Sequence, residues 1–274
     1  MLRSEGGTVV GARFVRLAAV GVALALSGES RADGPVDLPS AFRRAFDGVD
    51  ACVAIRDVAP GAGSAVSDEA ICGRRLPPCG TFELPATVIA IDRGVVPDAS
   101  APVKRNLPLQ DDPSGGVSLR EAFQRPIPWV YEEVARRIGS AAFDKALAGM
   151  RYGNAEVGGP VERIGTGDRS NGLTLSAPEQ VEFLARLKRG ELPTSSESQA
   201  RTVEIMPVAK SGEASVAWKT GVCDSTGWVV GWVDRPQRSS VIFATAAHGA
   251  DQKPEDLLAR TRKLLAELAL APAE

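Results

Sequence analysis

The chain has 274 residues, enough for one medium-sized domain or for one domain with a lobe inserted into it. Its 32 Lys and Arg residues nearly balance its 34 Asp and Glu residues, and no basic stripe or acidic tail stands out, so nothing points to nucleic acid. Hydrophobic residues make up 44% and charged residues 24%, which is the composition of a folded globular protein rather than a disordered one.

The N-terminus has the pattern of an export signal. Three arginines precede an apolar run at residues 17–26, and small side chains follow within Ser30-Arg31-Ala32. Ten apolar residues are too few to cross a bilayer of roughly 30 Å as a helix, and no later segment could span a membrane. We therefore expect residues 1–32 to be a signal peptide and 33–274 to form the mature, soluble domain, periplasmic or secreted. An uncleaved anchor and a buried helix are the alternatives.

The four cysteines suit an oxidising compartment. An even number of cysteines in an exported chain favours at least one disulfide. Four cysteines allow three complete pairings, and the sequence does not choose among them. They are Cys52, Cys72, Cys79 and Cys223.

The first hundred residues predict a strand, a turn and a helix. Residues 51–57 read as a buried strand, and a Gly/Ser-rich turn follows at 61–64. After a Pro-Pro loop, residues 81–94 have a helical pattern with apolar side chains for a core. Residues 95–116 are rich in Pro, Asp and Gly, and we expect them to run over the surface.

The middle of the chain predicts helices. Ser118 is a candidate N-cap, with Glu121 three residues later as in a capping box. Residues 129–138 and 141–150 follow as two further helices. Another helix begins at a Ser-Ala-Pro-Glu cap and runs over residues 176–190.

The last third predicts a sheet and a closing helix. Residues 215–220, 227–233 and 240–245 are rich in β-branched and aromatic side chains and read as successive antiparallel strands. Residues 254–270 form an amphipathic pattern. The predicted fold class is therefore α+β, an antiparallel sheet flanked by helices, with a helical lobe inserted at about 115–195.

Five segments resemble the class D serine β-lactamases in that family's order and spacing, over roughly residues 51–249. The resemblance implies the penicillin-recognising β-lactamase/transpeptidase fold. The segments are the nucleophile-like run Pro77–Pro85, the helix Pro128–Gly139, the tripeptides Tyr152-Gly153-Asn154 and Lys219-Thr220-Gly221, and the strand Gly227–Val233.

The residues that carry the family's chemistry are replaced. The resemblance implies Ser-x-x-Lys, a nucleophile and a carboxylated lysine base, but the chain has Gly80 and Glu83 at those positions. Gly80 has no side chain, and Glu83 cannot be carboxylated as a lysine amine can. The family's Ser-x-Val motif aligns with Pro126-Ile127-Pro128, so a relay hydroxyl is also lost. Its Phe-Trp-Leu stretch aligns with residues 168–170, which contain no aromatic side chain. We expect a pseudoenzyme.

Parts of the family's recognition apparatus are kept. The resemblance implies an oxyanion hole made by the backbone N–H groups of Gly80 and Val222, which do not depend on side chains. The expected ligands are β-lactams or peptidoglycan peptides, bound without covalent reaction. The expected ligand-binding residues are Tyr152, Asn154, Lys219, Thr220 and Gly221. The single histidine, His248, has no metal-ligand spacing around it, and we expect no metal site and no cofactor.

Three alternatives remain open from the sequence. Gly80 and Glu83 also fit a helix start, with Gly80 as N-cap, Glu83 at the third position and its carboxylate paired with Lys219. Cys79, next to the lost serine, is a candidate displaced nucleophile for acyl transfer with Lys219 as its helper, although a disulfide or buried thiol is favoured. A non-catalytic interaction protein that uses the outer surface of the fold is the third.

Overall fold

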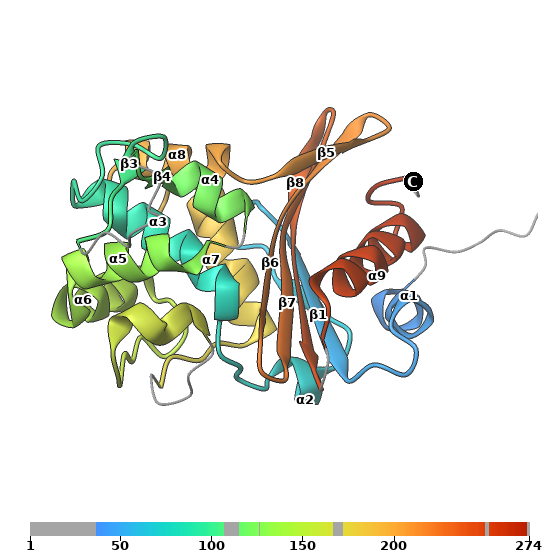
Figure 1. Ribbon diagram of the computed structural model, residues 1–274. Helices are drawn as coiled ribbons and strands as arrows, with labels where there is room; N and C mark the ends of the chain where they lie inside the picture. The colour runs from blue at the N-terminus through green and yellow to red at the C-terminus, as the bar shows by residue number, and fades with distance from the viewer. Residues whose placement is uncertain (1–36, 107–114, 126, 167–171, 250–251, 273–274) are drawn as a thin grey trace, which may run out of the picture. The chain divides into compact units, whose positions relative to one another are not determined.

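A six-stranded antiparallel sheet forms the centre of the molecule (Figure 1). The computed structural model describes residues 37–106, 115–125, 127–166, 172–249 and 252–272, so the predicted signal peptide lies outside the described residues. The strand order is β2-β1-β8-β7-β6-β5, and a separate two-stranded sheet pairs β3 with β4. The strands are β1 (Ala51–Asp57), β2 (Ser64–Val66), β3 (Pro102–Val103), β4 (Val117–Ser118), β5 (Val208–Ser211), β6 (Ala214–Cys223), β7 (Thr226–Arg235) and β8 (Arg238–His248).

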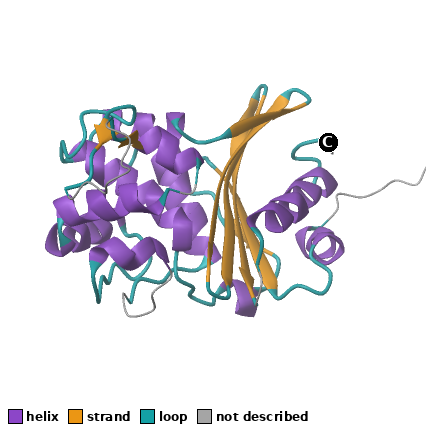
Figure 2. Ribbon diagram, in the orientation of Figure 1, coloured by secondary structure: helices purple, strands orange, loops and turns teal. Residues whose placement is uncertain are grey.

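Helices cover both faces of this sheet (Figure 2). On one face lie α3 (Glu83–Asp92), α4 (Leu119–Gln124), α5 (Pro128–Ile138), α6 (Ser140–Met150), α7 (Ala177–Arg189) and α8 (Ser196–Glu204), with the 3-10 helices η1 (Cys79–Phe82) and η2 (Val161–Thr166). The other face is covered by α1 (Leu38–Ala45) and α9 (Pro254–Glu267), and the short α2 (Glu69–Cys72) lies near one end of the sheet. The helices on the first face thus extend over residues 83–204, a longer part of the chain than the helical lobe predicted at about 115–195. No helix among the described residues is both long and apolar enough to cross a membrane.

The sheet separates two hydrophobic cores, which confirms the predicted α+β fold. Successive side chains of a strand point to opposite faces, and β7 serves both cores in this way. Trp228, Val230 and Trp232 pack toward the helical lobe, whereas Val229 and Val233 pack toward α1 and α9. Because both faces are covered, β7 is apolar almost throughout its length and lacks the polar alternation of a half-exposed strand.

Two predicted helix starts are confirmed in atomic detail. The Ser118 hydroxyl accepts a hydrogen bond from the backbone N–H of Glu121 at the start of α4. Ser176 and Glu179 form a full capping box at the start of α7, in which each side chain accepts a hydrogen bond from the other residue's backbone N–H. Gly190, with φ of 72°, ends α7 in the left-handed conformation that glycine adopts without strain.

Other boundaries differ from the predictions. The helix expected from residue 81 begins at Glu83, because residues 79–82 wind as the 3-10 helix η1. The predicted late strands are extended at both ends to 10 or 11 residues, since hydrogen-bonded pairing continues through glycines and alanines of low strand propensity. The sequence analysis did not predict α1, α8 or the edge strand β5.

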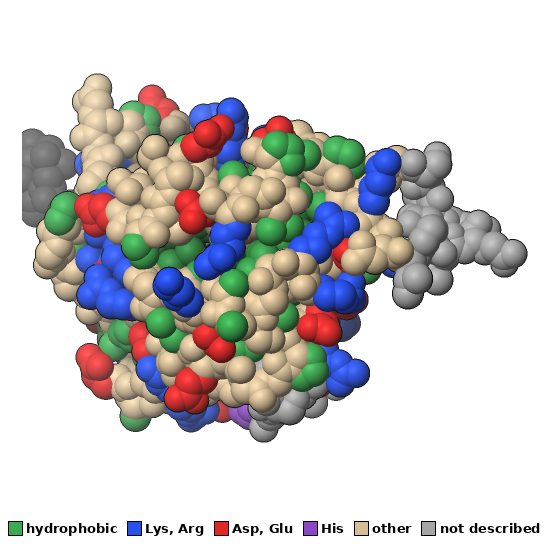
Figure 3. All heavy atoms as spheres, turned by 90° about the vertical axis from the view of Figure 1, so that its left-hand side faces the viewer, with side chains coloured by type: hydrophobic (Ala, Val, Ile, Leu, Met, Phe, Trp, Pro, Cys, Tyr) green, Lys and Arg blue, Asp and Glu red, His purple; other side chains and the backbone are tan. Residues whose placement is uncertain are grey.

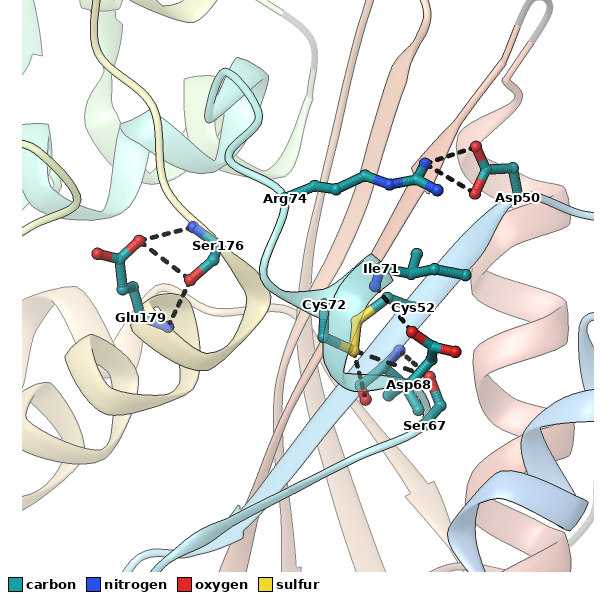
Figure 4. Close-up of a disulfide and its surroundings, with 10 residues drawn as sticks. Asp50, Cys52, Ser67, Asp68, Ile71, Cys72, Arg74, Ser176 and Glu179 are labelled. Carbon is teal, nitrogen blue, oxygen red and sulfur yellow. Dashed lines mark hydrogen bonds and ion pairs between the residues drawn. A yellow bond between two sulfur atoms is a disulfide. The ribbon is translucent and has the colours of Figure 1, made fainter.

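A buried disulfide, Cys52–Cys72, joins β1 to α2 (Figure 4). The Asp68 side chain caps α2 by accepting a hydrogen bond from a backbone N–H of its first turn. Beyond the helix, Arg74 forms an ion pair with Asp50, which directly precedes β1. The segment that leads to η1 is therefore attached to the sheet at two points.

Candidate functional site

A cleft of about 440 Å³ lies where η1, α4, α5 and η2 meet β6. It contains Gly80 and Glu83, the two positions where the family has its nucleophile and its lysine base, together with the Lys219–Val222 stretch of β6. A larger cavity, of about 730 Å³, lies between α9 and strands β5 and β6, and contains none of the predicted site residues. We therefore place the candidate site in the smaller cleft, where family position and geometry agree.

Gly80 lies directly against β6. A Cβ atom on Gly80 would lie 3.2 Å from Gly221 Cα and 3.3 Å from the Thr220 carbonyl oxygen. A Cβ atom on Gly221 would lie only 2.7 Å from the backbone nitrogens of Gly80 and Thr81, closer than side chains approach. Glycine at both positions therefore lets the two backbones meet. This contact brings the predicted oxyanion residues, Gly80 and Val222, to one wall of the cleft.

Glu83 and Lys219 form an ion pair in the cleft, a contact that the structural interpretation of Glu83 included. Lys219 Nζ lies 2.5 Å from Glu83 Oε2 and also donates a hydrogen bond to the carbonyl oxygen of Phe123, at 2.7 Å. The same ammonium lies 4.2 Å from the centroid of the Phe123 ring, in a cation–π contact. Burial raises the pKa of the Glu83 carboxyl group to about 7, against the opposing effect of the ammonium.

The predicted capping role of Gly80 and Glu83 is wrong. The N-cap of α3 is Phe82, which makes no side-chain capping bond, and Glu83 is the first residue of the helix rather than the third. The physical reason is that η1 winds more tightly than an α-helix and places Glu83 where its carboxylate reaches Lys219 instead of a backbone N–H.

Tyr131 is a cleft residue that the sequence analysis missed. Its hydroxyl group lies 2.8 Å from Thr87 Oγ1, and burial together with the nearby Glu83 carboxylate raises the pKa of Tyr131. Thr87 lies one helical turn after Glu83, and positions four residues apart share a helix face. Two signals could have identified Tyr131. One is the four-residue spacing of Glu83 and Thr87, and the other is the position of Tyr131 in the family-like helix that begins at residue 128.

Tyr152 and Asn154 are not brought to the cleft. Tyr152 is fully buried, with its ring in edge-to-face contact with Phe183. The Asn154 side chain donates a hydrogen bond to the Gly172 carbonyl and accepts one from the Thr174 backbone N–H. Both residues therefore stabilise the segment between α6 and α7. Lys219, Thr220 and Gly221, in contrast, line the cleft.

Cys79 is bonded to Cys223, so the hypothesis that Cys79 is a displaced nucleophile is wrong for this oxidised chain. All four cysteines are paired, since Cys52 bonds to Cys72. The thiolate is the nucleophilic form of cysteine, and a sulfur atom in a disulfide is not a thiolate. Cys79 adopts φ of 48°, a left-handed conformation uncommon for a residue with a side chain, immediately before Gly80. The bridge thus connects the residues next to Gly80 and Val222.

Other sequence-derived candidates lie away from the cleft or outside the described residues. Pro126 and residues 168–170, aligned with the lost hydroxyl and aromatic residues, lie outside the described residues. His248 is the last residue of β8 and is partly buried near the Cys52–Cys72 bridge. In the described part of the chain, no three His, Cys, Asp or Glu side chains come together as around a metal ion. Seen from the helical side, basic and acidic side chains are interspersed (Figure 3).

Comparisons with known proteins agree with the geometry. The family model for the penicillin binding protein transpeptidase domain matches residues 57–265. The chain is 30% identical to β-lactamase OXA-20 of Pseudomonas aeruginosa over 204 residues, covering 73% of this chain and 74% of that protein. It is 35% identical to β-lactamase OXA-15 of Pseudomonas aeruginosa over 176 residues, and this match spans 62% of each chain.

Solved structures share the fold. The class D β-lactamase BAT-2 superimposes with a TM-score of 0.74 at 20% identity, covering 86% of this chain and 98% of that chain. The class D β-lactamase YbXI from Nostoc superimposes with a TM-score of 0.71 at 24% identity, covering 85% of this chain and 99% of that one.

Proposed function

Because the chain belongs to the class D β-lactamase family, with its penicillin-binding transpeptidase domain, we propose that it is a penicillin-recognising protein that has lost β-lactam hydrolysis. Its ligands are β-lactams or cell-wall peptides, held without a covalent bond. The export-like pattern at residues 1–32 supports a role outside the cytoplasm, where such ligands are found.

One observation carries this proposal: the ion pair between Glu83 and Lys219 at the site of the family's chemistry. An acylating hydrolase needs a nucleophile, a base within hydrogen-bond reach and donors for the developing oxyanion. Here Gly80 offers no nucleophile, and the carboxylate of Glu83 is engaged by an ammonium rather than by a hydroxyl group. The backbone wall formed by Gly80, Gly221 and Val222 remains in the cleft, which favours recognition without reaction.

We expect the purified protein to form no adduct with a β-lactam and to hydrolyse none. The intact mass should not change after incubation with benzylpenicillin, and nitrocefin hydrolysis should equal the protein-free blank. Benzylpenicillin or its methyl ester should nevertheless raise the melting temperature saturably, because a ligand that binds only the folded state stabilises it. A covalent adduct or turnover would contradict loss of chemistry. A melting temperature unaffected by both compounds would contradict recognition and favour an interaction protein that uses its outer surface.

Restoring Ser and Lys should recover acylation only in part. In the Gly80→Ser/Glu83→Lys variant, the new side chain at position 80 meets Gly221 Cα and the Thr220 oxygen, at 3.2 and 3.3 Å from its Cβ atom. The new lysine also places a second cation beside Lys219, which has lost its carboxylate partner. We expect slow acyl-adduct formation by intact mass and no sustained turnover, with Gly80→Ser alone as the control. Turnover at rates typical of hydrolytic enzymes would show that the rest of the site is intact.

A further inference from the structure

Lys219 forms an ion pair with a carboxylate of the protein itself, that of Glu83, rather than being available to a ligand carboxylate. An ammonium group has three N–H donors, and two of them are engaged by Glu83 Oε2 and the Phe123 carbonyl oxygen. The side chains of Lys219 and Glu83 are only 10% and 16% exposed, so solvent screens their attraction weakly. An incoming anionic group would meet a cation whose charge is already balanced.

The other charges of the cleft do not replace this cation. Among the described residues that line the cleft, three carboxylates face two cations, the second cation being Arg125. Arg125, which directly follows α4, is largely exposed and pairs with Glu121 of that helix. Glu132 and Glu162 supply the remaining carboxylates, from α5 and η2. In the described part of the cleft, a ligand carboxylate would therefore find no buried cation besides Lys219, which is already paired.

We propose that Glu83 is an internal substitute for a ligand carboxylate, so that this cleft selects β-lactam-like or peptide ligands whose carboxyl group is masked as an amide or ester. The proposal rests on the proposed function, because it specifies which ligands the same cleft accepts. Backbone groups of Gly80 and Val222 would contact the carbonyl of the ligand, and Lys219 would stay paired with Glu83. Glu83 thus acts as a specificity-determining residue rather than as a catalytic one.

The test compares one ligand pair on three proteins. Benzylpenicillin and its methyl ester differ in the charge of one carboxyl group, and their dissociation constants are measured by calorimetric titration at pH 8.5. The unsubstituted chain should prefer the ester. Glu83→Gln should leave the affinity for the ester within about threefold and raise the affinity for the acid by about 10- to 30-fold, because a pKa of about 7 leaves only about one Glu83 side chain in thirty protonated at this pH. Glu132→Gln removes the same charge from the same cleft without freeing Lys219, and should change the acid-to-ester preference by less than about threefold.

A pH series on the unsubstituted chain tests the same inference without any substitution. Protonation of Glu83 removes the competing charge, so affinity for the acid should rise as the pH falls from 8.5 to 5.5, while affinity for the ester stays flat. The groups that face Glu83 are Lys219 on β6 and Tyr131 on α5, and across the cleft lie Arg125, Glu132 and Glu162. The rise should disappear in Glu83→Gln and persist in Glu132→Gln, which assigns it to Glu83 rather than to the other carboxylates.

The outcomes separate this inference from the proposed function. Equal binding of acid and ester by the unsubstituted chain, with no gain of acid affinity in Glu83→Gln, would overturn the inference and leave penicillin recognition standing. The same gain in Glu132→Gln as in Glu83→Gln would also overturn it, because cleft charge in general would then be the cause. Failure of all three proteins to bind either compound would overturn the proposed function, and the inference with it.

Discussion

Replacing Cys79 and Cys223 together by serine is expected to lower the free energy of unfolding by about 5 kcal/mol, whereas replacing Cys52 and Cys72 should cost about 3 kcal/mol. The difference arises in the unfolded chain. The first bridge joins residues 144 positions apart and the second joins residues 20 positions apart, so the first removes more conformational freedom from the unfolded state.

Urea denaturation of the two double variants and of the unsubstituted chain measures this difference. Because the two loops do not overlap in sequence, each double variant serves as the control for the other. Loss of Cys79–Cys223 should also weaken ligand binding, since this bridge holds η1 against β6 beside Gly80 and Val222. Loss of Cys52–Cys72 should leave the cleft unaffected. A smaller stability loss for the longer loop would mean that the unfolded state is already ordered around that bridge.

At pH 8, Lys219→Met is expected to destabilise the protein by about 1–3 kcal/mol, because the buried Glu83 carboxylate loses its partner and takes up a proton, and the Phe123 carbonyl oxygen loses a hydrogen bond. Adding Glu83→Gln to this variant should recover most of the loss, since the uncompensated charge is then gone. Thermal and urea unfolding of the single and double variants provide the measurement. Equal stability of the two variants would show that Glu83 is adequately solvated without Lys219.

The same variant should show a distinct pH dependence. Burial raises the pKa of Glu83 in the folded state above its ordinary value of 4.5, and loss of the ammonium raises that pKa further. A group whose pKa is raised by folding stabilises the folded state fully below the unfolded value, and this contribution is lost as pH rises through the folded value. Both proteins should therefore lose stability as the pH rises from about 5 to 7, and Lys219→Met should continue to lose it between pH 7 and pH 8, where this contribution levels off in the unsubstituted chain. A parallel pH profile for both proteins would contradict this.

Elements with local signals were predictable from the sequence. Ser118 and Ser176 carry capping side chains with a glutamate three residues later, and both helix starts are where that pattern places them. The late strands were predictable because β-branched and aromatic residues cluster there. The edge strand β5 was not, because Val208–Ser211 contains little of that composition and is held only by pairing with β6. The helix α1 does have a local start signal, the N-cap Asp37 with a proline in the first turn, and the sequence analysis overlooked it.

The candidate site was predictable in its residues but less so in their contacts. Family spacing placed Gly80, Glu83 and Lys219 together, and the structure contains the Glu83–Lys219 ion pair that one alternative included. The disulfide pairing was not predictable, because Cys223 meets Cys79 only through the packing of η1 on β6. Tyr152 matched a family tripeptide, but a tripeptide does not reveal that its ring lies in the core against Phe183.

The pairing of β1 with β8 has a consequence for how the chain assembles. In this pairing, Ala51 through Asp57 lie opposite Ala247 through Val241. The strand β1, one of the first to be synthesised, can therefore pair with β8 only near the end of synthesis. Until then β1 has only the three residues of β2 beside it, and its other edge exposes unpaired backbone groups. Such distant pairing slows folding, and an incomplete chain presents an aggregation-prone edge.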